Sequence, residues 1–223
     1  MNLVNNYILS AGIPTENLAH DWNADLGRTL NGSNLEGWED QVGGVNITEL
    51  TNPPELITNG NPSGDGDCVE FDGVAEWMGK AFTLAEPCTI YAVLRQETSV
   101  NNDGLFDGWT NLSGLLQQQT GGAIRYYAGS SAGNNSDLSV GSWGVVAVVA
   151  KTTTSTVRVN NNTKTSGNAN SNAPEPGGFT FGRVNPSAPA NCRFTRVLIY
   201  SVEHDDTQQN SVITPLNNIY SVF

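Results

Sequence analysis

Few residues in this sequence have the types and spacing that catalysis requires. The segment 69–96 contains no histidine and no nucleophile set beside a base. Its first part, 69–76, contains three acids, Glu70, Asp72 and Glu76, but a glycine breaks the strand pattern after Asp72 and leaves Glu76 outside the alternation of side chains. His20 and His204 lie far apart in the sequence and have no cysteine or histidine at metal-ligand spacing, so both are expected at the surface or in caps. The sequence therefore predicts a protein without enzymatic activity.

Four aspartates lie among glycines in two loop-like segments. Asp65 and Asp67 belong to SGDGDCVEFDG, and Asp103 and Asp107 belong to NNDGLFDG. Carboxylate oxygens on loops suit a hard cation such as calcium, although neither segment has the spacing of an EF-hand. The alternative is that these Asp-Gly pairs simply form turns. Calcium is thus the only cofactor that the sequence suggests.

Aromatic and amide side chains in loop-like segments form a second candidate site. A flat ring can pack against the apolar face of a sugar while neighbouring amides hydrogen-bond its hydroxyl groups. The residues that meet this description are Trp109, Asn111, Tyr126, Tyr127, Asn134 and Asn135. For any single aromatic residue, however, packing in the core or at the rim is the favoured interpretation.

The composition excludes several classes of partner. Acidic residues outnumber lysine and arginine 22 to 10, which gives a formal net charge of −12. Nucleic acids and anionic membranes attract a basic surface, so neither is an expected partner. No segment approaches the roughly 20 consecutive apolar residues of a membrane span. Cys68, Cys88 and Cys192 lack metal-site spacing, and we expect three small buried hydrophobic residues, with one disulfide plus a free thiol as the alternative.

The elements that position these residues are short strands joined by turns. Apolar runs alternate with clusters of Gly, Asn, Pro and Asp, which is typical of all-β proteins. In 88–96 alternate side chains share a face, and the nearly continuous apolar run 145–150 predicts a central strand covered on both sides. The segment 155–167 predicts a hairpin. No linker separates two cores, so we expect a single domain over residues 18–223.

The N-terminal segment, residues 1–17, differs from the rest. Four apolar residues fall at helical spacing before Pro14, and they predict a short helix or arm. The arm either caps the domain or docks onto a larger assembly through these residues, which are Leu3, Val4, Tyr7 and Ile8. The segment has neither the basic stretch nor the apolar run of a secretory signal, which favours a protein made and kept without export.

The C-terminal segment predicts a short helix. Asp205 or Asp206 can cap its N-terminus, with Gln208 or Gln209 near the third helical position. Pro215 is expected to end the helix, because proline lacks the N–H group that a helix interior needs.

Seven segments occur in an order that is specific in combination, although each is weak alone. They are DWNADLG, LEGWEDQVG, CVEFDGVAEWM, FTLAEPCTIYAVLR, WGVVAVVAKTTTSTVRVNNNT, FTFGR and CRFTRVLIYSVEHDDTQQNSVI. Together they resemble the laminin G-like branch of the concanavalin A-like lectin and glucanase superfamily. The resemblance covers residues 18–214 and implies an antiparallel jelly-roll sandwich of two sheets, with Trp22, Trp38 and Trp143 in the core. Glucanases of this superfamily carry an E-x-D-x-E strand motif, and nothing in this sequence matches it.

The resemblance also implies where such a protein acts. Laminin G-like domains recur as stand-alone units on phage capsids, fibres and tails, and this acidic chain carries an arm. We therefore expect a non-catalytic virion surface protein, made in the host cytoplasm, whose partners are other virion proteins and glycans. The alternative is a carbohydrate-binding module or lectin of a secreted bacterial protein, located outside the cell. Assembly into a homo-oligomer is compatible with both.

Overall fold

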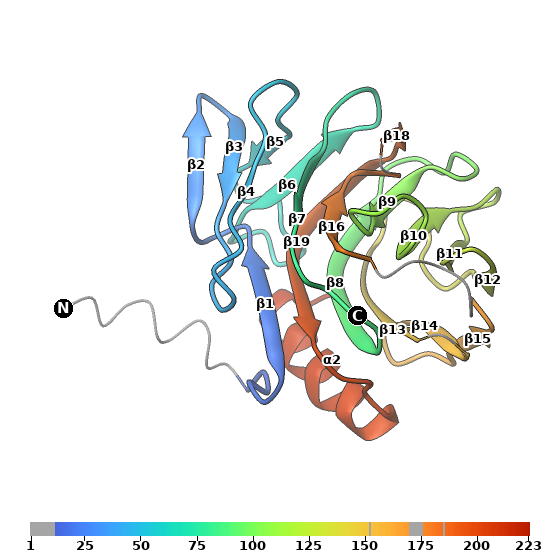
Figure 1. Ribbon diagram of the computed structural model, residues 1–223. Coiled ribbons are helices and arrows are strands. Elements are labelled where there is room, and N and C mark those ends of the chain that lie inside the picture. Colours follow the sequence, from blue (N-terminus) through green and yellow to red (C-terminus); the bar gives the residue numbers. More distant parts are fainter. Residues whose placement is uncertain (1–11, 152, 170–175, 185) are drawn as a thin grey trace.

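The computed structural model describes residues 12–151, 153–169, 176–184 and 186–223, which form two β-sheets and one helix (Figure 1). Paired strands run antiparallel, apart from a single residue pair between Pro189 and Gly104. The two sheets enclose an apolar core, and the helix packs on the other side of the larger sheet. The expected all-β sandwich of two antiparallel sheets with a C-terminal helix is therefore confirmed.

Eleven of the described strands form the larger sheet and eight form the smaller one. In order across the larger sheet they are β15 (Thr165–Gly167), β14 (Ser155–Val159), β13 (Trp143–Ala150), β8 (Cys88–Gln96), β19 (Asn191–Tyr200), β6 (Cys68–Asp72), β5 (Glu55–Ile57), β3 (Asn34–Trp38) and β2 (Arg28–Asn31), with β1 (Leu18–Asn23) beside β19 and β4 (Ile47–Thr48) beside β3. In order across the smaller sheet they are β12 (Ser131–Asn135), β11 (Ile124–Tyr127), β10 (Leu115–Gln118), β9 (Gly104–Asp107), β16 (Gly178–Phe181) and β7 (Met78–Ala81), with β17 (Arg183–Val184) and β18 (Ser187–Pro189) beside β9. The helix is α2 (Asp206–Tyr220).

The first apolar core lies between the two sheets. Alternate side chains of β8, among them Ile90 and Leu94, contribute to it, as the strand pattern predicts. Trp22 and Trp38 are fully buried in this core, so two of the three expected core tryptophans are confirmed. Trp143 is only half-buried and packs at the edge of the second core. The hairpin expected over 155–167 is present as β14 and β15.

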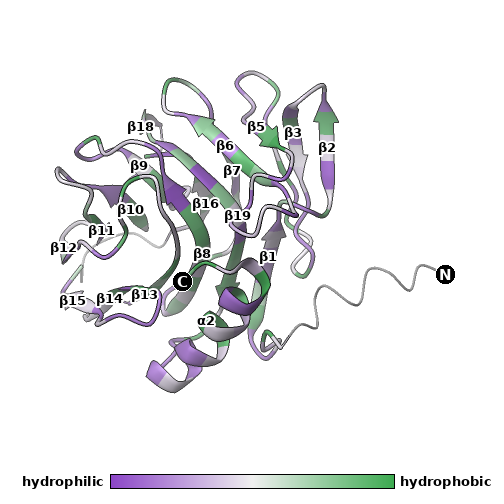
Figure 2. Cartoon of the chain, turned by 180° about the vertical axis from the view of Figure 1, so that it is seen from behind, coloured by the Kyte–Doolittle hydropathy of each residue, from purple (hydrophilic) through white to green (hydrophobic). Residues whose placement is uncertain are grey.

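The second apolar core lies between the larger sheet and α2. Tyr91 and Val93 of β8 and Val145 of β13 pack there against Val212 and Leu216 of the helix. Burial of one such side chain stabilises the fold by about 1.5–3 kcal/mol. The strands beneath the helix are therefore apolar on both faces, which Figure 2 shows as green strands next to a helix with alternating green and purple bands. No described helix is long and apolar enough to cross a membrane.

Helix α2 begins as the sequence predicts and ends later. The side chain of Asp205 accepts a hydrogen bond from the backbone N–H of Gln208 (2.8 Å), and Gln208 accepts one in return from the backbone N–H of Asp205 (2.9 Å). Pro215 lies inside the helix, so the expectation that it ends the helix is wrong. A proline in a helix costs about 3 kcal/mol, but the residues beyond it, Leu216 and Tyr220, are both buried, which offsets that cost.

Part of the expected N-terminal arm belongs to the fold. Ile13 is buried in the second core, and the hydroxyl of Tyr200 donates a hydrogen bond to the carbonyl of Pro14 (2.7 Å). Residues 12–17 therefore pack against the sandwich. The residues proposed for assembly lie outside the described residues; they are Leu3, Val4, Tyr7 and Ile8.

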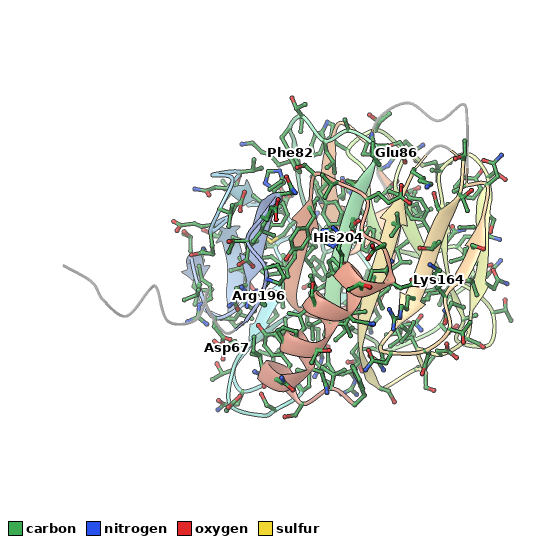
Figure 3. All side chains as sticks on the ribbon, turned by 90° about the horizontal axis from the view of Figure 1, so that it is seen from below. Asp67, Phe82, Glu86, Lys164, Arg196 and His204 are labelled. Carbon is green, nitrogen blue, oxygen red and sulfur yellow. The ribbon has the colours of Figure 1, made fainter. Side chains whose placement is uncertain are left out.

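Both histidines are buried, so the expectation of surface positions is wrong, although His204 directly precedes Asp205, the N-cap of α2. His20 Nδ1 lies 2.7 Å from an oxygen of Asp40, and His204 Nδ1 lies 2.8 Å from the hydroxyl of Tyr91. These partners satisfy Nδ1 of each ring, which lowers the cost of burying it. Figure 3 shows His204 and Arg196 close to α2.

The three cysteines are buried and, within the described part of the chain, none forms a disulfide, which confirms the expectation of small hydrophobic residues. Burial raises the pKa of the Cys68 thiol to about 12, because the thiolate would lose its hydration. The thiol therefore stays protonated and unreactive at neutral pH.

Candidate functional site

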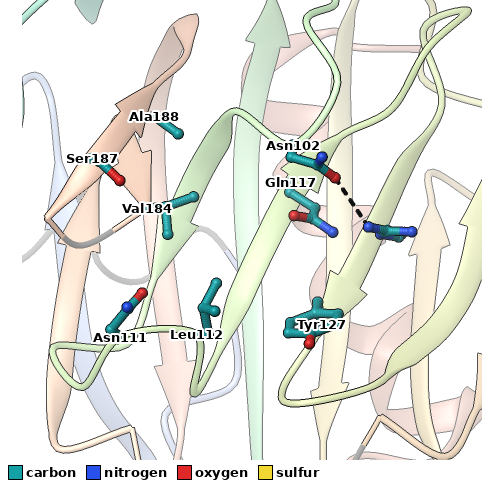
Figure 4. A pocket seen from close by; sticks show the side chains of 9 residues that line it. Asn102, Asn111, Leu112, Gln117, Tyr127, Val184, Ser187 and Ala188 are labelled. Atoms are coloured by element: carbon teal, nitrogen blue, oxygen red, sulfur yellow. Dashed lines mark hydrogen bonds between the residues drawn. The ribbon is translucent and has the colours of Figure 1, made fainter.

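A pocket of about 400 Å³ opens on the outer face of the smaller sheet, the face turned away from the core (Figure 4). Its volume falls in the range of roughly 300–1,000 Å³ that is usual for small-molecule sites. The wall residues come from β10 and β11, from the loops before and after β9, and from the segment that contains β17 and β18. They are Asn102, Asn111, Leu112, Gln117, Arg125, Tyr127, Val184, Ser187 and Ala188.

The strand register places a polar row across this face. Gln117 of β10 is paired with Arg125 of β11, and Arg125 is paired with Asn134 of β12. Directly paired residues in an antiparallel sheet project to the same side, so these three side chains share the outer face. Tyr127 follows Arg125 by two positions in β11 and therefore projects to the same face.

Arg125 is held between two amides. Its Nη2 group donates a hydrogen bond to the side-chain oxygen of Asn102 (3.1 Å), marked by the dashed line in Figure 4. The side-chain amide of Gln117 is best satisfied when its oxygen faces Arg125. In that orientation the oxygen accepts hydrogen bonds from Nε and Nη2 of Arg125, and the distance to Nη2 is 2.7 Å. Gln117 is buried, whereas Arg125 is half-buried. The floor of the pocket thus fixes the guanidinium and leaves it accessible from outside.

Tyr127 and three apolar side chains line the remainder of the pocket. The guanidinium carbon of Arg125 lies 5.9 Å from the centroid of the Tyr127 ring, within reach of a cation–π contact. Leu112, Val184 and Ala188 add apolar surface on the side of the β17–β18 segment. A ring with an accessible edge next to amides and a cation is able to bind a ligand that has both an apolar and a polar face.

The β17–β18 segment approaches the sheet closely at Gly104. A side chain at this position would collide with the backbone of Arg183 and Val184. Glycine therefore permits the segment to lie directly on β9 and to form one wall of the pocket.

Asp107 shapes the neighbouring wall. This buried carboxylate accepts hydrogen bonds from the backbone N–H groups of Gly108 (2.8 Å), Leu112 (3.0 Å) and Gly114 (3.3 Å). The loop after β9 therefore folds around the carboxylate. This fold presents Asn111 and Leu112 to the pocket.

Two of the residues predicted to bind glycans point into the core and not into the pocket. Tyr126 is fully buried, and its hydroxyl donates a hydrogen bond to Glu86 (3.3 Å). Asn135 is also buried and donates to the carbonyl of Val157 (3.3 Å). Both point toward the core because each is next to a residue that points outward, and the prediction that they contact a sugar is wrong.

The other predicted residues lie in or near the pocket. Asn111 and Tyr127 line it. Asn134 is exposed and extends the polar row at β12. Trp109 is 37% exposed and precedes Asn111 by two positions, but it is not among the lining residues. Sequence reasoning missed Asn102, Gln117 and Arg125; the alternation along IRYY was the signal that could have joined Arg125 to Tyr127.

Aspartates predicted to bind calcium have partners within the protein. In the part of the chain that the structure describes, no three His, Cys, Asp or Glu side chains are grouped to hold a metal. Asp67 is paired with Arg28, and Asp65 accepts a hydrogen bond from the hydroxyl of Ser63 (2.5 Å). Burial raises the pKa of Asp103, which disfavours the charged form that a cation would need. These contacts argue against calcium at the four aspartates, and calcium binding there stays a prediction.

The three acids of the segment 69–76 have structural roles. Glu70 forms an ion pair with Arg193 (3.1 Å). Asp72 Oδ1 accepts the backbone N–H of Val74 (2.7 Å), and Glu76 accepts the backbone N–H of Asp72 (2.8 Å). Asp72 and Glu76 thus hold the turn between β6 and β7, whereas Glu70 links β6 to β19.

Comparison with known proteins defines the fold class. A scan against protein-family models gives no match, and a search of curated proteins gives none either. Among solved structures, the chain is similar to a sialidase of Trypanosoma rangeli in complex with sialic acid, with a TM-score of 0.68 at 15% identity. It is also similar to an arabinofuranosidase complexed with arabinofuranosyl-α-1,2-xylobiose, with a TM-score of 0.63 at 15% identity.

These similarities extend over most of this chain but only part of the other proteins. The match to the sialidase covers 93% of this chain and 34% of the sialidase chain. The match to the arabinofuranosidase covers 84% of this chain and 51% of the other. At this level of identity the similarity shows a shared fold, a two-sheet antiparallel β-sandwich.

Proposed function

We propose that this protein is a non-catalytic carbohydrate-binding domain and that the pocket on the smaller sheet is its binding site. One observation carries the proposal: the strand register brings an aromatic ring, Tyr127, and a row of hydrogen-bonding side chains onto one outward face. Sugars have an apolar ring face and many hydroxyl groups, and this combination of side chains is complementary to both.

The same pocket supports binding without hydrolysis. Glycoside hydrolysis usually needs two carboxyl groups that flank the scissile bond. The residues found to line this pocket include no aspartate or glutamate. Asp107, the acid at its edge, is buried and accepts three backbone hydrogen bonds from its own loop.

The comparisons support a carbohydrate context. The two solved structures are complexes of glycan-degrading enzymes with sialic acid and with an arabinofuranosyl-xylobiose. This chain matches only a part of each, as expected for a domain that accompanies a catalytic one or acts by itself.

The test is binding of the purified protein to an array of diverse oligosaccharides, followed by titration calorimetry on the best ligand. Tyr127→Ala is expected to weaken binding on the order of tenfold, because the sugar loses the ring that packs against it. Phe223→Ala is the matched control, since Phe223 is 49% exposed and follows α2, on the far side of the larger sheet. Equal affinities of the Tyr127→Ala variant and the control would contradict this placement, and an array without any bound glycan would contradict the proposed function.

The more specific hypothesis of a virion surface protein stays a prediction. It rests on the resemblance and on the N-terminal arm, whose first eleven residues lie outside the described residues. Fractionation of source particles distinguishes the two settings. A fixed copy ratio with a capsid or tail protein would support the virion hypothesis, whereas a secreted chain attached to a catalytic domain would support the module.

A further inference from the structure

We propose that the pocket recognises an acidic sugar and that Arg125 binds the carboxylate of that sugar. This inference rests on the proposed function and narrows it from glycans in general to glycans that carry a carboxylate, such as uronic acids and sialic acids. The argument uses the partners of Arg125, the side chains around it and the charge of the whole chain.

Arg125 differs from most basic residues of the protein in its partners. Six other lysines and arginines form an ion pair with at least one carboxylate; they are Arg28, Arg95, Lys151, Lys164, Arg193 and Arg196. Among the described residues, the hydrogen-bond partners of Arg125 are the neutral amides of Asn102 and Gln117. In a chain with 22 acids and 10 lysines and arginines, a half-buried arginine without a carboxylate partner has its charge available for a ligand.

The geometry keeps that charge accessible. The bonds to the two amides use Nε and Nη2 of Arg125, and within the described part of the chain Nη1 has no hydrogen-bond partner. The amides hold the planar guanidinium in one orientation, which reduces the entropy that binding would cost. An arginine fixed in this way binds a carboxylate through charge-assisted hydrogen bonds, which are stronger than those between neutral groups.

The surrounding side chains favour a sugar as the carrier of the carboxylate. Tyr127 offers a ring beside the guanidinium, and Asn111 and Ser187 offer hydrogen-bonding groups at the edge of the pocket. An acidic sugar presents a ring face, hydroxyl groups and a carboxylate within one residue. A pocket of about 400 Å³ is large enough for a compact ligand of this kind.

The overall charge of the protein argues against a nonspecific attraction to anions and predicts how such binding depends on salt. A net charge of −12 repels anionic glycans at long range. Salt screens that repulsion beyond about 8 Å at physiological ionic strength, whereas the contact inside the pocket is screened less. Moderate salt should therefore preserve or improve binding, in contrast to a basic surface that loses its ligands as salt is added.

The experiment compares acidic oligosaccharides with their neutral counterparts. Oligogalacturonides, glucuronic-acid oligosaccharides and sialyl-lactose are presented beside the same compounds after reduction of the carboxyl group to a primary alcohol. We expect the unmodified protein to prefer the acidic form by about tenfold or more, the range of a hydrogen bond to a charged group. Arg125→Gln should abolish this preference, and Arg125→Lys should restore only a part of it, because the ammonium keeps the charge but is not held in one orientation by the two amides.

Lys80→Gln serves as the matched control. Lys80 is exposed on β7, at the opposite edge of the smaller sheet, so its replacement removes the same charge away from the pocket. Thermal unfolding of each variant shows whether the fold is kept. An unchanged preference in Lys80→Gln and a lost preference in Arg125→Gln would support the inference.

The outcomes separate the inference from the proposed function. If neutral and acidic glycans bind equally well, or if Arg125→Gln retains the preference, the inference is overturned while glycan binding stands. If no glycan binds, the proposed function fails and the inference fails with it. Sulfated sugars and acidic peptides are included as probes, and a stronger response to either than to the carboxylated sugars would also overturn the inference.

Discussion

The pair of Asp21 and Arg196 is the interaction whose loss the structure predicts to be most damaging. Asp21 belongs to β1 and Arg196 to β19, the strand at the centre of the larger sheet. The two carboxylate oxygens accept hydrogen bonds from Nε (2.9 Å) and Nη2 (2.6 Å) of the arginine. Both side chains are almost completely buried, with 0% and 1% exposed. Asp21→Asn keeps the shape of the side chain and leaves the arginine charge buried without its counterion.

The expected cost follows from this burial. Breaking a buried ion pair by removing one partner costs about 3–5 kcal/mol, because the remaining charge has lost both water and its partner. For a chain of this length, each kcal/mol lowers the melting temperature by about 2–4 °C, so a fall of about 6–20 °C is expected. Lys151→Gln removes one member of an exposed pair, Lys151 and Glu203 (2.6 Å), and should cost at most about 1 kcal/mol.

The assay is urea unfolding followed by tryptophan fluorescence, with thermal unfolding as a second measurement. The Asp21→Asn variant should unfold at a lower urea concentration with an unchanged dependence on urea. Replacing Arg196 by methionine in the same variant removes the orphaned charge and should recover part of the lost stability. If Asp21→Asn is no less stable than Lys151→Gln, or if the second replacement only adds damage, the reasoning about this pair is refuted.

Two further predictions concern the helix and the turn after β6. Leu216→Ala should destabilise the fold by about 2–5 kcal/mol, because it leaves a cavity where α2 packs on the larger sheet. Thr214→Ala, on the exposed side of the helix, should change the unfolding free energy little. Equal effects of the two replacements in urea unfolding would contradict this packing. Burial, together with the charges of Asp72, Glu55 and Glu70, raises the pKa of Glu76 from 4.5 to about 7. The folded state therefore binds a proton that the unfolded state releases between these values, and the unfolding free energy contributed by Glu76 should fall as the pH rises from 4.5 to 7. Glu76→Gln should remove this decrease, and an unaltered pH profile of stability would argue against the shift.

The β-sandwich could be predicted because the signals for its strands and turns lie within short segments of the sequence. Alternating apolar residues, as in 88–96, specify a strand and the face that it buries, and clusters of Gly and Asn specify the turns. The capping of α2 by Asp205 and Gln208 was equally local. Pro215 misled the prediction because its own preference is local, whereas the burial of Leu216 depends on a sheet assembled from distant segments.

The candidate site was only partly predictable because it depends on which strands become neighbours. Tyr126 and Tyr127 cannot both face outward, and the rule of alternation alone could have separated them. By contrast, the contact of Arg125 with Asn102 joins residues 23 positions apart. The wall formed by Val184 comes from a segment that lies on β9, far from it in sequence. These contacts follow from sheet order and register, which the pattern of a single strand does not encode.

The layered arrangement explains why a ligand site is expected on the smaller sheet. The centre of the larger sheet is occupied on both faces, by the inter-sheet core on one side and by α2 on the other, and its strands are apolar on both faces as a result. The smaller sheet buries one face in the same core, but its other face carries Gln117, Arg125 and Tyr127. Burying polar side chains without hydrogen-bond partners costs free energy. A row of polar side chains on this face is therefore stable only if water or a ligand contacts it. The segment of β17 and β18 covers β9 and leaves β10 and β11 accessible, so the proposed ligand would meet this row in the pocket beside Arg125.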